Sequence, residues 1–177
     1  MKQAFRGLTR RELLASGAVA GASLVVGQGF VAHASEEWAL EAKGVAPHTA
    51  ATLIQMARDI YPHDRIPDKH YAIAIKGHDD KAAADPDYKA QLEEGVAGLD
   101  MMAEGQGARD YLDIGWEADR VALLRQIENT AFFQGIRGDL VVSLYNQKEV
   151  WPVFGYEGAS YEEGGYLYRG FDDIAWL

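Results

Sequence analysis

The segment PHTAATLIQMARDIYP, residues 47–62, decides how this chain folds. It opens on a proline, whose missing amide hydrogen costs nothing in the first turn of a helix. It closes on a second proline, which disfavours helix in the residue before it. Between the two prolines, Leu53, Ala57, Ile60 and Tyr61 follow the spacing i, i+4, i+7 and i+8. That spacing places apolar side chains on one face, so the segment predicts an amphipathic helix that packs against others.

Two further helices are predicted immediately after this one. Asp68 is expected to cap a helix over residues 68–75. The pair Asp85-Pro86 has the residue types of an N-cap and a first helical residue, and Gly105 stands where the helix that starts there should end. The apolar face of this third helix consists of Tyr88, Leu92, Val96 and Leu99.

Two more helices complete the predicted body, over residues 119–128 and 130–146. No segment alternates apolar and polar residues with a period of two, so strands are expected to be few or absent. We therefore expect an all-α fold, a single irregular bundle of about five helices. The side chains predicted to point inward from the last helix are Phe133, Ile136, Leu140, Leu144 and Tyr145.

Residues 151–177 differ in kind from this body. They hold eight of the chain's 19 aromatic residues, interspersed with glycines and without a helical period. A segment of this composition cannot easily form a compact core of its own, so it must lie along an apolar surface. We predict that it is an extended tail that binds a partner. The expected interface residues are Trp151, Phe154, Tyr156, Tyr161, Tyr166 and Tyr168.

The other end of the chain has the pattern of a twin-arginine export signal. Arg10 and Arg11 are followed, after one residue, by Leu13 and Leu14, and residues 13–35 carry no charged side chain. Ala32 and Ala34 flank a histidine in a small-x-small cleavage motif. We predict that residues 1–34 are a cleaved signal read by the twin-arginine translocase. Residues 35–177 then form one periplasmic domain without a membrane span, and an uncleaved membrane anchor is the alternative.

Charge and cysteine content exclude several classes of protein. The formal net charge is −10 and residues 1–34 contribute +3, so residues 35–177 carry −13. Such an acidic domain repels nucleic acid and anionic lipid, and it suits a basic partner surface. The chain has no cysteine. Disulfides, thiolate zinc sites, iron–sulfur clusters, c-type haem attachment and cysteine nucleophiles are therefore excluded.

No catalytic, cofactor or metal site is predicted on this chain. Motifs for dinucleotides, nucleoside triphosphates, serine nucleophiles and zinc proteases are all missing. The histidines of the most metal-like cluster are separated by six and seven intervening residues, which matches no ligand signature. Because the twin-arginine route carries folded proteins, a partner is expected to need it. The cluster consists of His63, Asp64, His70, His78, Asp79 and Asp80.

Two motifs in the tail suggest the class of protein to which this partner belongs. W-x-x-x-G-Y-x-G at residues 151–158 and G-G-Y at residues 164–166, with the segments 53–62 and 132–145, resemble the small-subunit family of gluconate 2-dehydrogenase (subunit 3). The resemblance implies a helical escort for a flavoprotein large subunit of the glucose–methanol–choline (GMC) type. That subunit would hold FAD and the catalytic histidine, and would be exported on the small subunit's signal. A c-type cytochrome subunit is a further implied partner.

The expected function is therefore that of an accessory subunit of a periplasmic FAD-dependent alcohol or sugar dehydrogenase. The first alternative is a free-standing periplasmic helical protein that binds carbohydrate on its aromatic tail. The second is an exported enzyme whose site is assembled from residues that no motif reveals.

Overall fold

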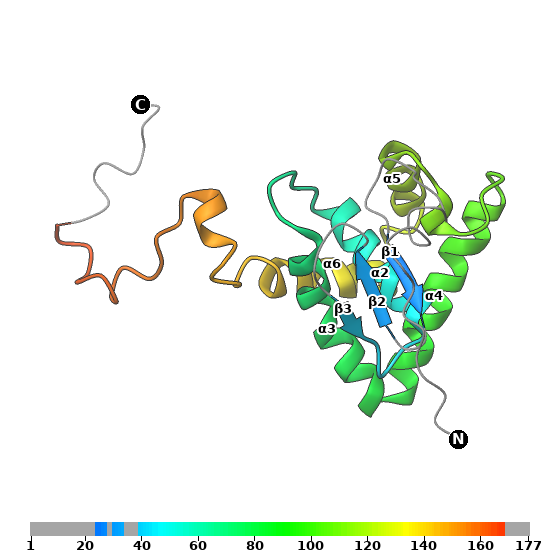
Figure 1. The fold of residues 1–177 in the computed structure, drawn as a ribbon, viewed down its shortest axis with the longest axis horizontal. Coiled ribbons are helices and arrows are strands. Elements are labelled where there is room, and N and C mark those ends of the chain that lie inside the picture. The colour runs from blue at the N-terminus through cyan, green and yellow to red at the C-terminus, as the bar shows by residue number, and fades with distance from the viewer. Residues whose placement is uncertain (1–23, 28–29, 34–38, 169–177) are drawn as a thin grey trace, which may run out of the picture.

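The computed structural model describes residues 24–27, 30–33 and 39–168 and confirms a mostly helical fold (Figure 1). Within these ranges, five α-helices and two short 3-10 helices follow three short strands. The strands are β1 (Leu24–Gly27), β2 (Phe30–His33) and β3 (Ala39–Glu41). The helices are α2 (Pro47–Ile60), α3 (Asp68–Ala84), α4 (Pro86–Glu104), η1 (Tyr111–Asp113), α5 (Glu117–Gln126), α6 (Ala131–Ser143) and η2 (Trp151–Phe154).

Helix α2, the segment with the two prolines, forms the centre of the bundle. Ten of its 14 residues are buried, and it contacts α3, α4, α5, α6 and the sheet. Ala50, Ala51 and Ala57 have no exposed surface, and their small side chains let neighbouring elements approach closely. The sequence predicts one apolar face here. The structure buries most of the circumference, as is typical of a helix inside a core.

Helix α3 corrects two details of the sequence prediction. It continues nine residues beyond residue 75, because His78, Asp79 and Ala82 are buried and give its polar second half a packed side. Asp68 is also not the N-cap, since Pro67 takes that position. The Asp68 carboxylate instead accepts a hydrogen bond from Arg58, 2.6 Å away.

The predicted starts of α4 and α6 are confirmed by side-chain caps. Asp85 Oδ1 accepts hydrogen bonds from the amides of Asp87 and Tyr88, at 3.0 and 3.1 Å. Thr130 Oγ1 accepts one from the amide of Phe133, at 3.2 Å. Four of the predicted inward side chains of the last helix, Phe133, Ile136, Leu140 and Leu144, are buried, and Tyr145 is half-buried.

The three strands form an antiparallel sheet in the order β1-β2-β3. β2 is the central strand, so Ala32 pairs with Val25 on one side and with Ala39 on the other. The sheet lies against α2, in front of it in the view of Figure 1. Val31 on β2 and Leu40 on β3 are buried. β1 and β2 belong to the stretch that the sequence assigns to the export signal.

A buried carboxylate fixes the chain between β3 and α2. Asp79 of α3 accepts hydrogen bonds from the amides of Lys43, Gly44 and Val45, at 2.9, 2.8 and 3.0 Å. Gly44 lies so close to α3 that a Cβ there would come within 2.1 Å of the Asp79 carbonyl oxygen. A larger residue at this position would therefore push the segment off the helix.

Beyond α6 the chain turns through η2 and extends away from the helical body (Figure 1). The segment after Phe154 contains turns but no further helix or strand up to residue 168. In the described ranges, no helix combines the length and the apolar character that crossing a membrane requires.

Candidate partner interface

The base of the tail is attached to the helical body by aromatic contacts. The Phe154 ring meets His63 and Tyr145 edge-on, with centroids 5.2 and 5.6 Å apart. His63 Nε2 lies 2.7 Å from the Tyr145 hydroxyl, and Arg65 donates a hydrogen bond to the Val153 carbonyl at 2.9 Å. Burial and the Arg58 guanidinium hold the pKa of His63 below its ordinary value. The first turn of the tail therefore belongs to the folded body.

Trp151 holds the next part of the tail in place. Its Nε1–H donates to the carbonyl of Tyr145 at 2.9 Å, and its ring lies edge-on to Tyr156 with centroids 5.0 Å apart. Gly155 makes this pairing possible, because its φ of 72° reverses the chain in a conformation that other residues rarely adopt. Gly158 also has a positive φ, 110°, and a Cβ there would be in van der Waals contact with the Trp151 ring at 3.6 Å.

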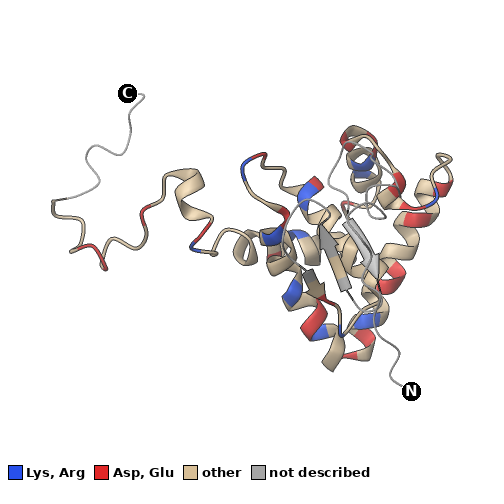
Figure 2. Cartoon of the chain, viewed as in Figure 1, with Lys and Arg blue, Asp and Glu red and all other residues tan. Residues whose placement is uncertain are grey.

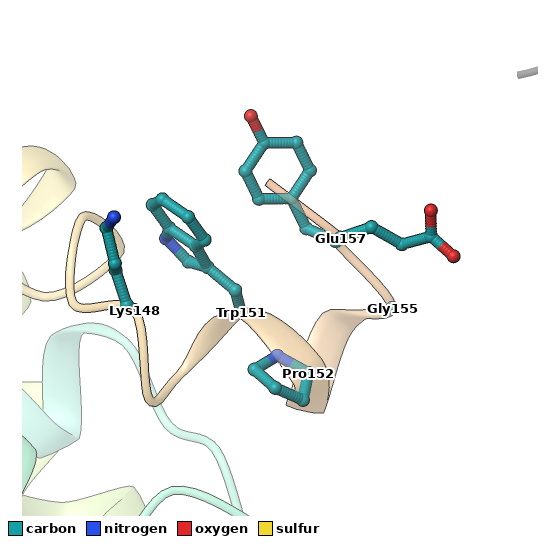
Figure 3. A pocket seen from close by; sticks show the side chains of 6 residues that line it. Lys148, Trp151, Pro152, Gly155 and Glu157 are labelled. Carbon is teal, nitrogen blue, oxygen red and sulfur yellow. The ribbon is translucent and has the colours of Figure 1, made fainter. Parts of the chain in front are cut away.

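A pocket of about 400 Å³ opens beside this aromatic pair (Figure 3). The Lys148 ammonium lies 5.7 Å from the centre of the Trp151 ring, close enough for a cation–π contact. Two aromatic rings with an ammonium beside them can hold an apolar, planar or sugar-like group. The lining residues are Lys148, Trp151, Pro152, Gly155, Tyr156 and Glu157.

Past Gly158, the tail presents its aromatic side chains to solvent. Tyr161, Tyr166 and Tyr168 expose 79%, 78% and 91% of their surface. Leu167, between the last two, exposes 80%. These side chains contribute nothing to the core, and contiguous exposed apolar groups commonly mark an interaction site.

The six predicted interface residues thus fall into two groups. Trp151 and Phe154 contact the body, and Tyr156 packs on Trp151, so these three position the tail. Tyr161, Tyr166 and Tyr168 project beyond it. Of the residues predicted for the export signal and its cleavage, the structure describes only Ala32, which lies in β2. Arg10, Arg11, Leu13, Leu14 and Ala34 lie outside the described residues.

The metal-like cluster of the sequence is dispersed in the structure. His70 Nδ1 lies 2.7 Å from the Gln147 side-chain oxygen, and Asp79 binds the backbone amides before α2. Buried His78 contacts the Tyr88 hydroxyl through Nδ1, while its Nε2 lies 3.2 Å from Asp139 without a hydrogen bond. Among the residues that the structure describes, no three potential ligands converge on one point.

One buried polar network is invisible in the sequence. Both oxygens of Asp59 accept hydrogen bonds from Arg120, at 2.7 and 2.8 Å, and the Tyr111 hydroxyl donates a third at 2.7 Å. Burial, and then the Asp59 charge, raise the pKa of Tyr111 far above its ordinary value. The partners are 52 and 61 residues from Asp59. The sequence shows only that Asp59 is a charged residue on a mostly apolar helix, and it does not indicate these partners.

The chain matches no protein-family model, no curated protein and no solved structure.

Proposed function

We propose that this chain is the small accessory subunit of a periplasmic FAD-dependent alcohol or sugar dehydrogenase, and that it stabilises the catalytic flavoprotein and carries it through the twin-arginine translocase. The observation that carries the proposal is the exposed aromatic tail on a folded helical body. Tyr161, Tyr166, Leu167 and Tyr168 have no place in the core. Ordering such groups is favourable only where they are buried against another surface.

The charge of the chain indicates the character of that surface. α4 carries five acidic residues and one lysine, and acidic residues recur in the tail, as Figure 2 shows. Residues 151–177 alone carry five acidic side chains against one arginine. A partner with a basic face would be steered toward this surface and would fit its aromatic groups with arginine side chains.

The partner's chemistry follows from the resemblance of the tail motifs. It would be a GMC-type flavoprotein that holds FAD and acts on alcohols or sugars, and a c-type cytochrome could accept its electrons. On this view the small subunit contributes no catalytic residue. Its buried polar side chains, such as Asp59 and Asp79, are used by the fold itself.

The test is co-expression of the tagged full-length chain with the product of the neighbouring gene, which the proposal expects to be a GMC-type flavoprotein without an export signal of its own. We expect the two to co-purify with the visible absorption bands of bound flavin. A matched chain that stops after Gly155 keeps the tail base and loses the exposed tyrosines, and it should purify without flavin. If the truncated and complete chains retain the flavoprotein equally, the tail is not the interface. If neither retains it, the accessory-subunit proposal is wrong.

A second function is favoured by the Trp151 pocket. Its volume lies in the range of small-ligand sites, and an indole beside a tyrosine is a surface on which a sugar ring can stack. A free-standing carbohydrate-binding protein would show heat of binding when mono- and disaccharides are titrated into the purified chain. Trp151→Ala should abolish that heat and Trp116→Ala, a substitution of an exposed tryptophan outside the pocket, should not.

A further inference from the structure

The apolar half of the predicted export signal is folded onto the body of the protein. β1 and β2, residues 24–27 and 30–33, pair with each other, and β2 pairs with β3. Both contact α2, and Val31 has no exposed surface. An export signal must be free of such pairing to engage a translocase. The segment that should enter the translocase therefore lies on the surface of the domain that it is expected to export.

The surface beneath these two strands is held in place without them. Asp79 binds the three amides that follow β3. Glu93 of α4 accepts a hydrogen bond from the Ala46 amide at 2.7 Å and another from the Thr49 hydroxyl. β3 and the start of α2 are thus fixed to α3 and α4 by contacts outside the signal.

Removal of β1 and β2 would leave two complementary features side by side. The backbone of β3, residues 39–41, would lose its ladder partner, and the side of α2 that the two strands cover would be open. An unpaired strand edge beside a buried helix face is a template for strand addition from another chain. We call this surface, formed by β3 and the covered side of α2, the α2–β3 surface.

We propose that the α2–β3 surface binds an apolar strand of the flavoprotein partner, and that β1 and β2 of the predicted signal occupy it until the partner displaces them. The present occupant defines the chemistry of its replacement. The strands LVVG and FVAH contain no residue that is charged at neutral pH, and they pair antiparallel in order next to β3. This inference rests on the proposed function, and it adds a second contact to the one made by the tail.

The arrangement couples export to assembly. While β1 and β2 are paired on α2, these two segments of the predicted signal are held away from the translocase. Docking of the partner releases them, so the loaded complex is exported in preference to the empty small subunit. The two strands also compete with the partner for the surface. If β1 and β2 cover it nine-tenths of the time, the apparent affinity of the flavoprotein for the full-length chain falls about tenfold.

Hydrogen exchange on the full-length chain tests the proposal, with and without the FAD-bound flavoprotein that the co-expression experiment is expected to identify. In the free chain, we expect amides in residues 24–33 and 39–41 to be protected. In the complex, residues 24–33 should exchange rapidly while residues 39–41 and α2 stay protected, because the partner's strand replaces β2. Continued protection of residues 24–33 in the complex would overturn the proposal.

A substitution provides the second measurement. Val31→Asp places a charge at a fully buried position and should release β1 and β2 without the partner. The flavoprotein should then bind the full-length variant about tenfold more tightly than the parent chain. Ala20→Asp puts the same charge into the signal before β1, and it should leave the affinity unchanged. Equal affinity for all three chains would overturn the displacement idea, whereas no binding to any of them would mean that the proposed function itself is wrong.

Discussion

At the scale of single residues, the fold depends on buried charges that are fully paired. Asp59 exposes 1% and Arg120 13% of the side chain, and each completes the hydrogen bonds of the other. Arg120 also donates to the carbonyl of Ile114 at 2.8 Å. A pair of this kind is weak evidence for net stability, because removing two ions from water is costly. Removing only one of the two ions nevertheless destabilises the protein strongly, because the other charge stays buried without its partner.

Arg120→Met should therefore lower the free energy of unfolding by about 3–5 kcal/mol, because it leaves the Asp59 carboxylate buried without its cation. Urea unfolding of the full-length chain, followed by circular dichroism, measures the loss. Arg109→Met is the matched control, since Arg109 pairs with Asp113 on an exposed surface and its loss should hardly move the midpoint. A similar midpoint for both variants would show that Asp59 does not depend on Arg120.

His78 gives the stability a pH dependence of known sign. Burial, opposed by Asp139 and reinforced by Lys81, holds its pKa below the ordinary value of 6.5. The unfolded chain therefore takes up a proton near pH 6.5 that the folded chain refuses. Stability is complete above that pH and falls as the pH drops toward the pKa of the folded state.

When the pH falls from 7.5 to 5.5, the free energy of unfolding should drop less in His78→Gln than in the parent chain. The difference should be up to about 1.4 kcal/mol for each pKa unit by which folding lowers the pKa of His78. His63→Gln should act in the same direction, because the pKa of His63 is also lowered. Urea midpoints at several pH values give the slope. An unchanged slope in both variants would show that neither histidine is kept neutral by the fold.

At the scale of elements, local signals in the sequence predict the helices well and their contacts poorly. The proline pair of α2, the Asp85 cap and the Thr130 cap are local, so their helices begin where the sequence indicates. The second half of α3 has no local apolar signal. It is helical because His78 and Asp79 are buried against segments far away in the chain.

The sheet of three short strands has no local signal in the sequence either. β1 and β2 lie in an apolar stretch that lacks alternation, and their pairing with β3 depends on the position of α2. Asp79 shows how such a contact works, because a carboxylate within a run of charged residues becomes the acceptor for three amides that are 34 to 36 residues away. No pattern in the neighbourhood of residue 79 indicates those partners.

Asp79→Ala should destabilise the protein by about 3 kcal/mol or more, because the buried amides of Gly44 and Val45 lose a charged acceptor. Asp80→Ala is the control on the adjacent residue, since Asp80 only pairs with Lys76 on the surface and should cost at most about 0.5 kcal/mol. Unfolding curves of the two variants provide the comparison. Equal losses would mean that water or other groups replace the Asp79 carboxylate.

The tail was predictable as a segment but not residue by residue. Composition indicates that residues 151–177 cannot easily form a core of their own. It does not reveal that Trp151 and Phe154 bind the body while Tyr161, Tyr166 and Tyr168 are exposed. That division depends on Tyr145 and His63, which meet the tail only in the folded chain.

Tyr166→Ala should weaken binding of the flavoprotein about 30-fold or more, the effect of losing an interface hot spot, and should leave unfolding of the isolated chain unchanged. Trp151→Ala should reduce both binding and stability, because it also removes the hydrogen bond to Tyr145 and the packing under Gly158. Affinity and thermal unfolding are measured on the same preparations. If Tyr166→Ala melts the chain without a direct effect on binding, Tyr166 packs inside the protein.

At the scale of the whole molecule, the proposed function gives the two ends of the chain separate tasks, with one helical body between them in the sequence. The tail extends from η2, whereas β1 and β2, which belong to the predicted signal, form the sheet on α2 together with β3 (Figure 1). Neither task needs a cofactor on this chain. The strong negative charge of residues 35–177 is compatible with both, because it favours a basic partner and disfavours adhesion to anionic lipid.

Export provides the decisive prediction for the molecule as a whole. Replacing Arg10 and Arg11 with lysine keeps the charge of the signal but removes the twin-arginine pair, so the chain and its flavoprotein should both remain in the cytoplasm. Cell fractionation followed by a dehydrogenase assay measures this, and Lys2→Arg is a control that changes a basic residue outside the motif. Normal periplasmic activity in the double variant would show that the flavoprotein travels without this chain. Retention of the chain alone would show that the two proteins are exported independently, and the escort role would then be wrong even if they assemble later.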